Sequence, residues 1–252
     1  KTDAGPRGDF VHELDVLTGR LLDAIEDLGV GDNTLVLFNS DNGPETMHTV
    51  WMREDHHHDP AGGYRGVKRD GWEGGHRVPF IARWPSRIPA GQVSKQLTNT
   101  TDIFATIASI IGYKLPENAA VDSFDMLPAM LGTQDDDEPI RPHMLTQSFR
   151  SEFQIRQGDW KYLDHIGSGG NNYSKGTLQP YALPETAPDA TGQLYNLAKD
   201  PSETTNLFFT ETSKREALQN LLKTLAIAGN GRSAPKKRDP IGIENIPFVQ
   251  DR

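Results

Sequence analysis

Apolar residues recur at intervals of three and four along residues 9–28. The recurring positions are Val11, Leu14, Leu17, Leu21, Ile25 and Leu28. This spacing places them on one face of a helix, so the pattern predicts an amphipathic helix over this range. We expect Asp9 to cap its N-terminus and Gly29 to end it.

Short continuous apolar runs follow at residues 34–38 and 78–84. Such runs are typical of strands that are covered on both faces of a mainly parallel sheet, and Pro79 favours an edge or a strand start. A helix that leads into a buried strand indicates the α/β class. Residues 43–77, which are rich in Gly, His and charge, are expected to form a long irregular loop.

The pattern changes after the acidic run Gln134–Pro139, which we interpret as a solvated boundary. Before this boundary we expect helices at 103–111 and 124–131. After it we expect strands at 144–149, 153–163 (with a turn at 158–159) and 194–197, followed by a helix at 213–228. The predicted parts are therefore an α/β portion at 1–133, a small antiparallel-sheet domain with a terminal helix at 134–230, and a loosely held tail at 231–252.

Composition excludes several classes of function. The 252 residues carry 26 Lys and Arg against 35 Asp and Glu, a net charge of −9, which argues against a general binder of nucleic acid or anionic membranes. An anionic substrate would need local cations or a metal. The lack of cysteine excludes disulfides, thiolate zinc sites and a cysteine nucleophile. We find neither a signal peptide nor an apolar stretch near the roughly 18 residues that span a membrane.

The strongest site signal is Asp41–Asn42, at the carboxyl end of the predicted strand 34–38. Reactive groups gather at such ends in open α/β sheets, and carboxylate and amide oxygens suit Ca²⁺ or Mg²⁺. Asp-Asn-Gly is also ordinary turn chemistry, which the local pattern alone favours about two to one. Because Ca²⁺ takes six to eight oxygens, the remaining ligands would have to come from elsewhere.

A second signal is the glycine-rich cationic segment 64–79. Lys68 can reach an anion there as a point charge, although a solvated surface lysine is the commoner outcome. Glu73 and Arg77 could simply pair with each other. The histidines at 56–58 lack the spacing of zinc ligands. No nucleophile elbow, P-loop or dinucleotide fingerprint is present, so the sequence indicates an oxyanion pocket without a nucleophile.

Taken in order, these motifs resemble the type I, formylglycine-dependent sulfatases (arylsulfatases). The matching segments are S-D-N-G at 40–43, G-V-K at 66–68, E-G-G-H-R-V-P at 73–79, W-P at 84–85, G-D-x-x-x-E-L-D at 8–15, the helix at 101–112, and L-Y-N-L, D-P-S-E and N-L at 194–197, 200–203 and 206–207. The resemblance implies an alkaline-phosphatase-like fold. It also implies that Asp41 and Asn42 are two ligands of an active-site Ca²⁺ (Mg²⁺ is possible), and that Lys68 acts as the catalytic, substrate-binding contact to the sulfate group.

In this family a hydrated formylglycine, made from Cys or Ser, attacks the sulfur of a sulfate ester. Its C/S-x-P-S-R motif has no counterpart here, because Pro85-Ser86-Arg87 has Arg83 at the position of the modified residue. We therefore expect the C-terminal half of a sulfatase, with no nucleophile and no activity alone. Its expected partners are its own N-terminal half and a sulfated small molecule or carbohydrate, and the family implies a periplasmic or secreted location.

The same reasoning predicts that strands 34–38 and 78–84 expose apolar surface and unpaired edges in this chain, so that it joins its N-terminal half or self-associates. Two other interpretations remain open. One is a phosphatase or phosphomutase relative with two transition metals, which usually carries Asp-His where Asp41–Asn42 stand. The other is a non-catalytic module that keeps the fold.

Overall fold

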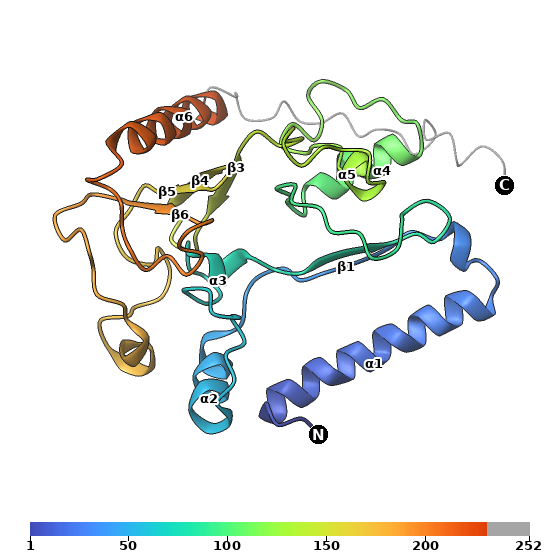
Figure 1. Cartoon of the computed structure of the whole chain (residues 1–252), viewed down its shortest axis with the longest axis horizontal. Helices are drawn as coiled ribbons and strands as arrows, with labels where there is room; N and C mark the ends of the chain where they lie inside the picture. Colours follow the sequence, from blue (N-terminus) through green and yellow to red (C-terminus); the bar gives the residue numbers. More distant parts are fainter. Residues whose placement is uncertain (231–252) are drawn as a thin grey trace.

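Two antiparallel sheets and a long N-terminal helix make up the described part of the chain, residues 1–230, in this computed structural model (Figure 1). The elements are α1 (Gly5–Asp27), the 3₁₀ turn η1 (Gly31–Asn33), β1 (Val36–Asn39), α2 (Thr46–His56), α3 (Glu73–His76), β2 (Phe80–Arg83), α4 (Asp102–Ile110), α5 (Leu127–Met130), β3 (Met144–Gln147), β4 (Phe153–Gln157), β5 (Trp160–Leu163), the 3₁₀ turn η2 (Gly176–Tyr181), β6 (Gln193–Asn196) and α6 (Thr212–Asn230). The tail expected at 231–252 lies outside the described residues.

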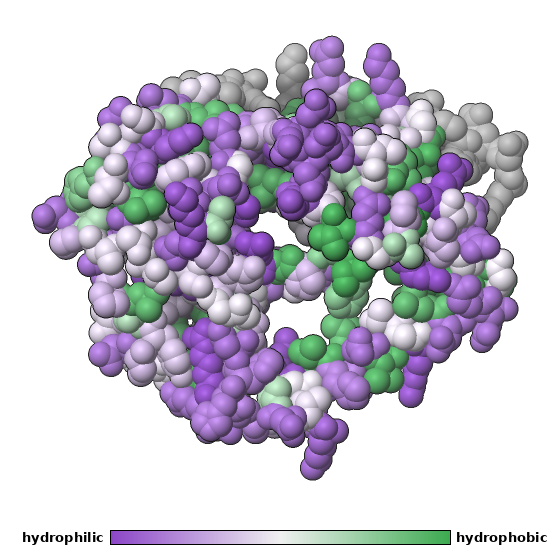
Figure 2. Space-filling view, in the orientation of Figure 1, coloured by the Kyte–Doolittle hydropathy of each residue, from purple (hydrophilic) through white to green (hydrophobic). Residues whose placement is uncertain are grey.

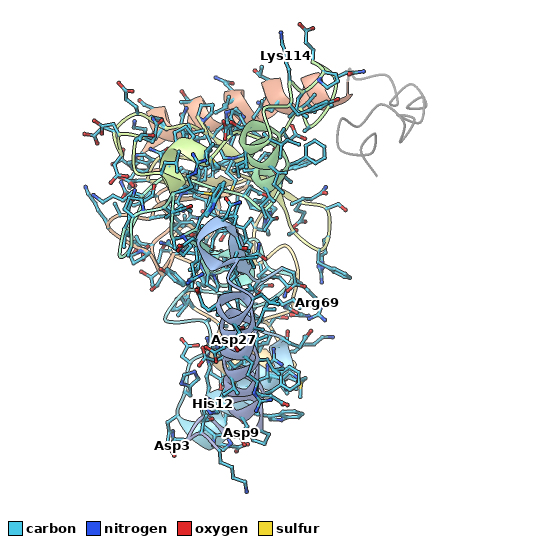
Figure 3. All side chains as sticks on the ribbon, turned by 90° about the vertical axis from the view of Figure 1, so that its right-hand side faces the viewer. Asp3, Asp9, His12, Asp27, Arg69 and Lys114 are labelled. Atoms are coloured by element: carbon cyan, nitrogen blue, oxygen red, sulfur yellow. The ribbon has the colours of Figure 1, made fainter. Side chains whose placement is uncertain are left out.

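Helix α1 confirms the predicted amphipathic helix but begins four residues earlier than expected. A proline in its first turn fits this start, since proline is pre-organised there, and Asp9 instead accepts a hydrogen bond from the amide of Thr2. Gly29, at φ +69°, follows the C-cap as predicted. Only Gly5 is buried in α1, and its apolar face is exposed. Polar side chains such as His12 lie along the same helix (Figure 3).

Strands β1 and β2 pair with each other in antiparallel order, Val36 opposite Arg83 and Asn39 opposite Phe80. The expectation of a mainly parallel sheet is wrong for the described residues, whereas the prediction that these two strands expose apolar surface and unpaired edges in this chain is confirmed. No other described strand pairs with either one, neither strand holds a buried residue, and Ile81 is 58% exposed. A continuous apolar run indicates that a strand can be buried on both faces. The layers that would bury it must be supplied by other segments.

The segment 43–77 is not irregular throughout, because it contains helix α2. The Glu45 side chain accepts a hydrogen bond from the amide of Thr46 at the helix start, and His57 ends it at φ +50°. Val50 and Met52 are buried on its inner face. The expectation failed because a high content of His and charge obscured these few apolar positions.

The C-terminal elements confirm the predicted small antiparallel sheet. Strands β3-β4-β5-β6 form a meander, with Gly158 at φ +56° in the turn between β4 and β5. Helix α6 packs Leu218 and Leu222 against Ile155 and Tyr162 of the sheet. The boundary at 133/134 stays a prediction. Contacts across it include the buried Arg141–Asp102 ion pair, whose carboxylate also accepts from the amides of residues 99 and 124.

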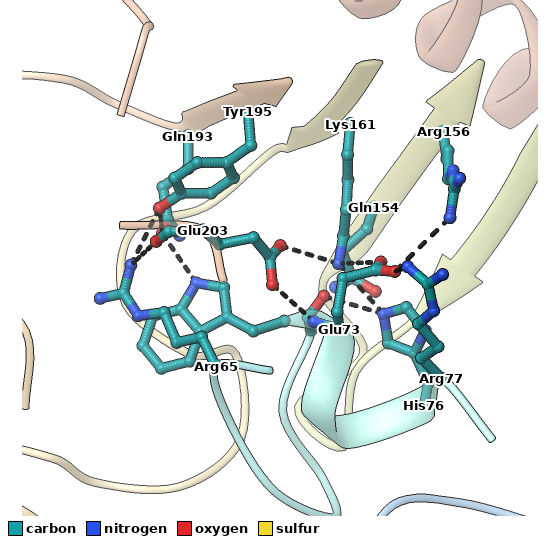
Figure 4. Close-up of polar contacts among 12 residues, drawn as sticks. Arg65, Glu73, His76, Arg77, Gln154, Arg156, Lys161, Gln193, Tyr195 and Glu203 are labelled. Atoms are coloured by element: carbon teal, nitrogen blue, oxygen red, sulfur yellow. Dashed lines mark hydrogen bonds and ion pairs between the residues drawn. The ribbon is translucent and has the colours of Figure 1, made fainter. Parts of the chain in front are cut away.

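A buried charged cluster fixes α3 against this sheet (Figure 4). The Nζ of Lys161, on β5, lies 2.9 Å from Oε1 of Glu73 and 2.9 Å from Oε1 of Glu203, and all three side chains are at most 2% exposed. Oε2 of Glu203 accepts the amide of Glu73 at 2.6 Å. The Glu73–Arg77 pair considered from the sequence exists at 3.3 Å, but Lys161 is the closer partner. We call Glu73, Lys161 and Glu203 the Glu73 cluster.

Replacing Lys161 by Met is expected to destabilise the chain strongly, because Glu203 would stay buried without its cation and Glu73 would keep only the more distant Arg77 and Arg156. We expect a loss of about 3–5 kcal/mol in the free energy of unfolding, measured by urea denaturation. Lys95→Met is the control, since Lys95 is 83% exposed and should change stability by no more than about 0.5 kcal/mol. Equal effects of the two substitutions would contradict this role of the cluster.

The cluster also predicts a loss of stability in acid. Burial and the Lys161 ammonium lower the pKa of His76 from 6.5 to about 4; burial would raise the pKa of Glu73, but Lys161 and other nearby cations lower it from 4.5 to about 2. At these two groups the folded chain binds fewer protons than the unfolded chain, so they lower stability between pH 6.5 and 4 (His76) and between pH 4.5 and 2 (Glu73). Burial raises the pKa of Glu203, so this carboxyl group acts in the opposite direction. As the pH is lowered from 6.5 to 4.5, the melting temperature should fall less steeply in His76→Gln than in the wild type.

Candidate functional site

The loop that follows β1 carries Asp41 and Asn42 and lies directly against α3. The amide of Gly43 donates to the carbonyl of Gly75 at 2.9 Å. A Cβ on Gly43 would lie 1.8 Å from the carbonyl oxygen of Gly74, so no other residue fits without moving the backbone. The loop position is therefore set by the same short helix that the Glu73 cluster holds.

Lys68 lies beside this loop, as the hypothesis of a shared oxyanion site requires. Its amide donates to the carbonyl of Pro44 at 2.9 Å. Its Nζ lies 3.7 Å from Oε2 of Glu45, and its side chain is 37% exposed. The structure thus brings two segments that are some 25 residues apart in the sequence to one place.

The hydrogen bonds of Asp41 and Asn42 leave one oxygen of each available. Oδ1 of Asp41 accepts the amide of Asn42 at 3.0 Å, and Nδ2 of Asn42 donates to the Gly43 carbonyl at 2.9 Å. Oδ2 of Asp41 and Oδ1 of Asn42 make no hydrogen bond to the described residues. Such hard oxygen donors fit a Ca²⁺ or Mg²⁺ ion, while the local bonds also agree with the alternative of an ordinary turn.

These two residues cannot form a complete metal site by themselves. Within residues 1–230 no group of three or more His, Asp or Glu residues is placed to hold a metal ion. The histidines at 56–58 form no such group among the described residues, and Asp135, Asp136 and Asp137 are exposed. Further ligands would have to be supplied from outside the described residues.

Sequence reasoning missed the residues that hold the turn around Lys68. Asp70 is only 3% exposed; its Oδ2 accepts from the amide of Val67 (3.0 Å) and the hydroxyl of Tyr173 (2.7 Å). Nδ2 of Asn171 donates to Oδ1 of Asp70 at 2.8 Å and to the carbonyl of Lys68 at 2.9 Å. The only sequence signal was an aspartate within the glycine-rich segment, because the partners are about a hundred residues away.

Part of the segment 165–192 lines a cavity that is separate from the Asp41–Asn42 loop. This cavity has a volume of about 340 Å³ and lies between Arg65, Trp72, Tyr173 and Tyr181. The Arg65 guanidinium stacks on Trp72 at 3.7 Å. The proposed metal ligands and Lys68 do not line it.

Comparisons with known proteins define the class. The Sulfatase family model matches residues 3–113, which include the site described above. The chain is 32% identical over 228 residues to the N-acetylgalactosamine-6-O-sulfatase of Bacteroides thetaiotaomicron (89% of this chain, 42% of the relative). It is 36% identical over 217 residues to human arylsulfatase A (82% and 40%). The chain thus spans about two fifths of the length of these curated relatives.

Solved structures of sulfatases have a fold similar to that of this chain. A structure described under glycosaminoglycan metabolism by Bacteroides thetaiotaomicron superposes with a TM-score of 0.74 at 32% identity, over 88% of this chain and 45% of the other. A Pseudoalteromonas sulfatase gives 0.64 at 27%, over 86% and 42%. The chain belongs to the sulfatase family and adopts part of its alkaline-phosphatase-like fold. A phosphonate monoester hydrolase of Agrobacterium radiobacter, at 0.54 and 22%, shares the fold alone.

Gly43→Ala is expected to displace the loop, because its methyl group would overlap the Gly74 carbonyl. We expect a loss of about 1–3 kcal/mol in the free energy of unfolding, measured by urea denaturation. Gly19→Ala is the matched control, since a Cβ there has nothing within 4 Å and Ala suits the middle of a helix better than Gly. A neutral Gly43→Ala variant would show that the contact with α3 is not tight.

Proposed function

We propose that this chain is the C-terminal part of a sulfatase that hydrolyses sulfate esters to an alcohol and sulfate. Residues 1–133 would belong to its large sheet domain and 134–230 would form its small antiparallel domain. The observation that carries the proposal is the hydrogen bond from the Lys68 amide to the Pro44 carbonyl, because it joins the backbone of this lysine to the loop of Asp41 and Asn42. Family membership and the partial coverage of the relatives support it.

The residues of this chain would bind and orient the sulfate group. Asp41 and Asn42 would hold part of a Ca²⁺ (or Mg²⁺) shell, and Lys68 would place its ammonium against the sulfate oxygens. Preplaced positive charge lowers the barrier, because negative charge grows on those oxygens during the reaction. The metal and a formylglycine from outside this chain would supply a Lewis acid and the nucleophile. The expected substrate is a sulfated carbohydrate or small molecule, in a periplasmic or secreted enzyme.

The upstream half of the same protein is the partner that the exposed apolar surface fits best. Phe10, Leu14 and Leu21 of α1 are each about half exposed. Figure 2 shows hydrophobic residues around openings in the middle of the molecule. No described helix is long and apolar enough to cross a membrane. Burial of this surface would stabilise the association of the two halves.

The test compares purified residues 1–252 with the full gene product that contains them, using hydrolysis of an aryl sulfate. We expect no turnover by the chain alone and metal-dependent turnover by the full product. Lys68→Ala in the full product should lower kcat about 10²–10³-fold because it removes charge aimed at the transition state. Lys175→Ala, at an exposed position, is the control.

Robust hydrolysis by the isolated chain would overturn the inference of a missing nucleophile. A full product that ignores sulfate esters but cleaves phosphate esters with bound zinc would instead support the phosphatase interpretation. A full product that cleaves neither would support the non-catalytic module.

A further inference from the structure

We propose that Glu45 is the positioning residue of Lys68: it holds the end of the neighbouring Arg69 side chain and orients the Lys68 ammonium toward the loop of Asp41 and Asn42. The inference rests on the proposed role of Lys68. Glu45 occupies the N-cap of α2, only three residues after Asn42. It therefore links the loop of the proposed metal ligands to the lysine through a single side chain.

Glu45 makes its strongest contacts with Arg69, next to the lysine. The carboxylate takes both terminal nitrogens of the guanidinium, Nη1 to Oε1 at 2.6 Å and Nη2 to Oε2 at 3.0 Å. A paired arrangement of this kind fixes direction as well as distance. The hydrogen bonds from Arg69 hold the pKa of Glu45 near 2, so the carboxylate is ionised at neutral pH.

The backbone of Arg69 fixes where the Lys68 side chain begins. Its φ of +87° is unfavourable for a residue with a side chain, and such a conformation persists only when its surroundings hold it. Glu45 holds the Arg69 side chain, and the amide of Phe149 donates to the Arg69 carbonyl at 3.1 Å. The strained residue reverses the chain immediately after Lys68 and so sets where that side chain begins.

The distance between Glu45 and Lys68 fits an electrostatic attraction without a direct hydrogen bond. At 3.7 Å from Oε2, the lysine Nζ feels the negative charge but makes no direct hydrogen bond to it. Its donors make no hydrogen bond to the residues that the structure describes, so they can face an anionic group. Because Arg69 takes both carboxylate oxygens, Lys68 is the less engaged cation of the two.

The lysine backbone is held separately, which makes the role of Glu45 testable. The Pro44 carbonyl accepts the Lys68 amide, and Asn171 donates to the Lys68 carbonyl. Loss of the Glu45 charge should therefore leave the turn folded. It should mainly release the ends of the Lys68 and Arg69 side chains. Glu45→Gln suits this purpose, because its amide oxygen can still accept the Thr46 amide at the start of α2.

The first experiment is a double-mutant cycle in the full gene product with an aryl sulfate. Glu45→Gln should lower kcat about 10-fold or more, as expected for a misplaced catalytic group, while KM stays within about 3-fold. In a Lys68→Met background the same change should have less than about a 2-fold effect, because it acts only through the lysine. Equal losses in both backgrounds would overturn the inference. Glu54→Gln, at an exposed position on the same helix, is the matched control.

The second experiment needs no turnover. Acetic anhydride labels lysine amines, and mass spectrometry compares Lys68 with Lys114, an exposed lysine well separated from Arg69 (Figure 3). We expect Glu45→Gln to raise the labelling of Lys68 relative to Lys114 several-fold. Unchanged labelling would overturn the inference. If the full product lacks sulfatase activity but labelling rises, the proposed function fails while the hold of Glu45 on Lys68 stands.

Discussion

One buried ammonium group holds together the parts of the chain on which the site depends. Lys161 of β5 lies between the carboxylates of Glu73 and Glu203, so three distant segments meet at one charge. Such a cluster is stable only when complete, because each partner left alone would be a buried, uncompensated ion. Through Glu73 it fixes the backbone of the following glycines, and the Gly43 loop packs directly on that backbone.

The site is thus built from rigid neighbours rather than from one element. Pro44, Asp70 and Asn171 hold the backbone of the turn that carries Lys68, and Glu45 holds the side-chain ends. Preorganisation of this kind matters for anion chemistry, because groups that are already in place need not reorganise as charge develops. The small antiparallel sheet therefore contributes to the geometry of a site that lies on the other part of the chain.

The exposed apolar surface has the opposite character. Helix α1 and strands β1 and β2 have the hydrophobic pattern of covered elements, yet among the described residues neither strand holds a buried residue and the helix buries only Gly5. The hydrophobic pattern of a segment reflects its burial in the complete fold. Its exposure in this structure reflects only the neighbours that this chain itself supplies.

The sequence by itself determined the local elements and the motif residues. The spacing that defined α1 and α6 and the glycine turn between β4 and β5 depend on neighbours close in the chain. Recognisable motifs singled out Asp41, Asn42 and Lys68 as candidates for one site. Tertiary structure alone decided the antiparallel pairing of β1 with β2, and the partners of Glu73 and Asp70. Glu73 showed only its i+4 neighbour Arg77 in the sequence, while its main partner is 88 residues away. Local patterns constrain dihedral angles and faces, but which buried charges meet depends on how distant segments pack.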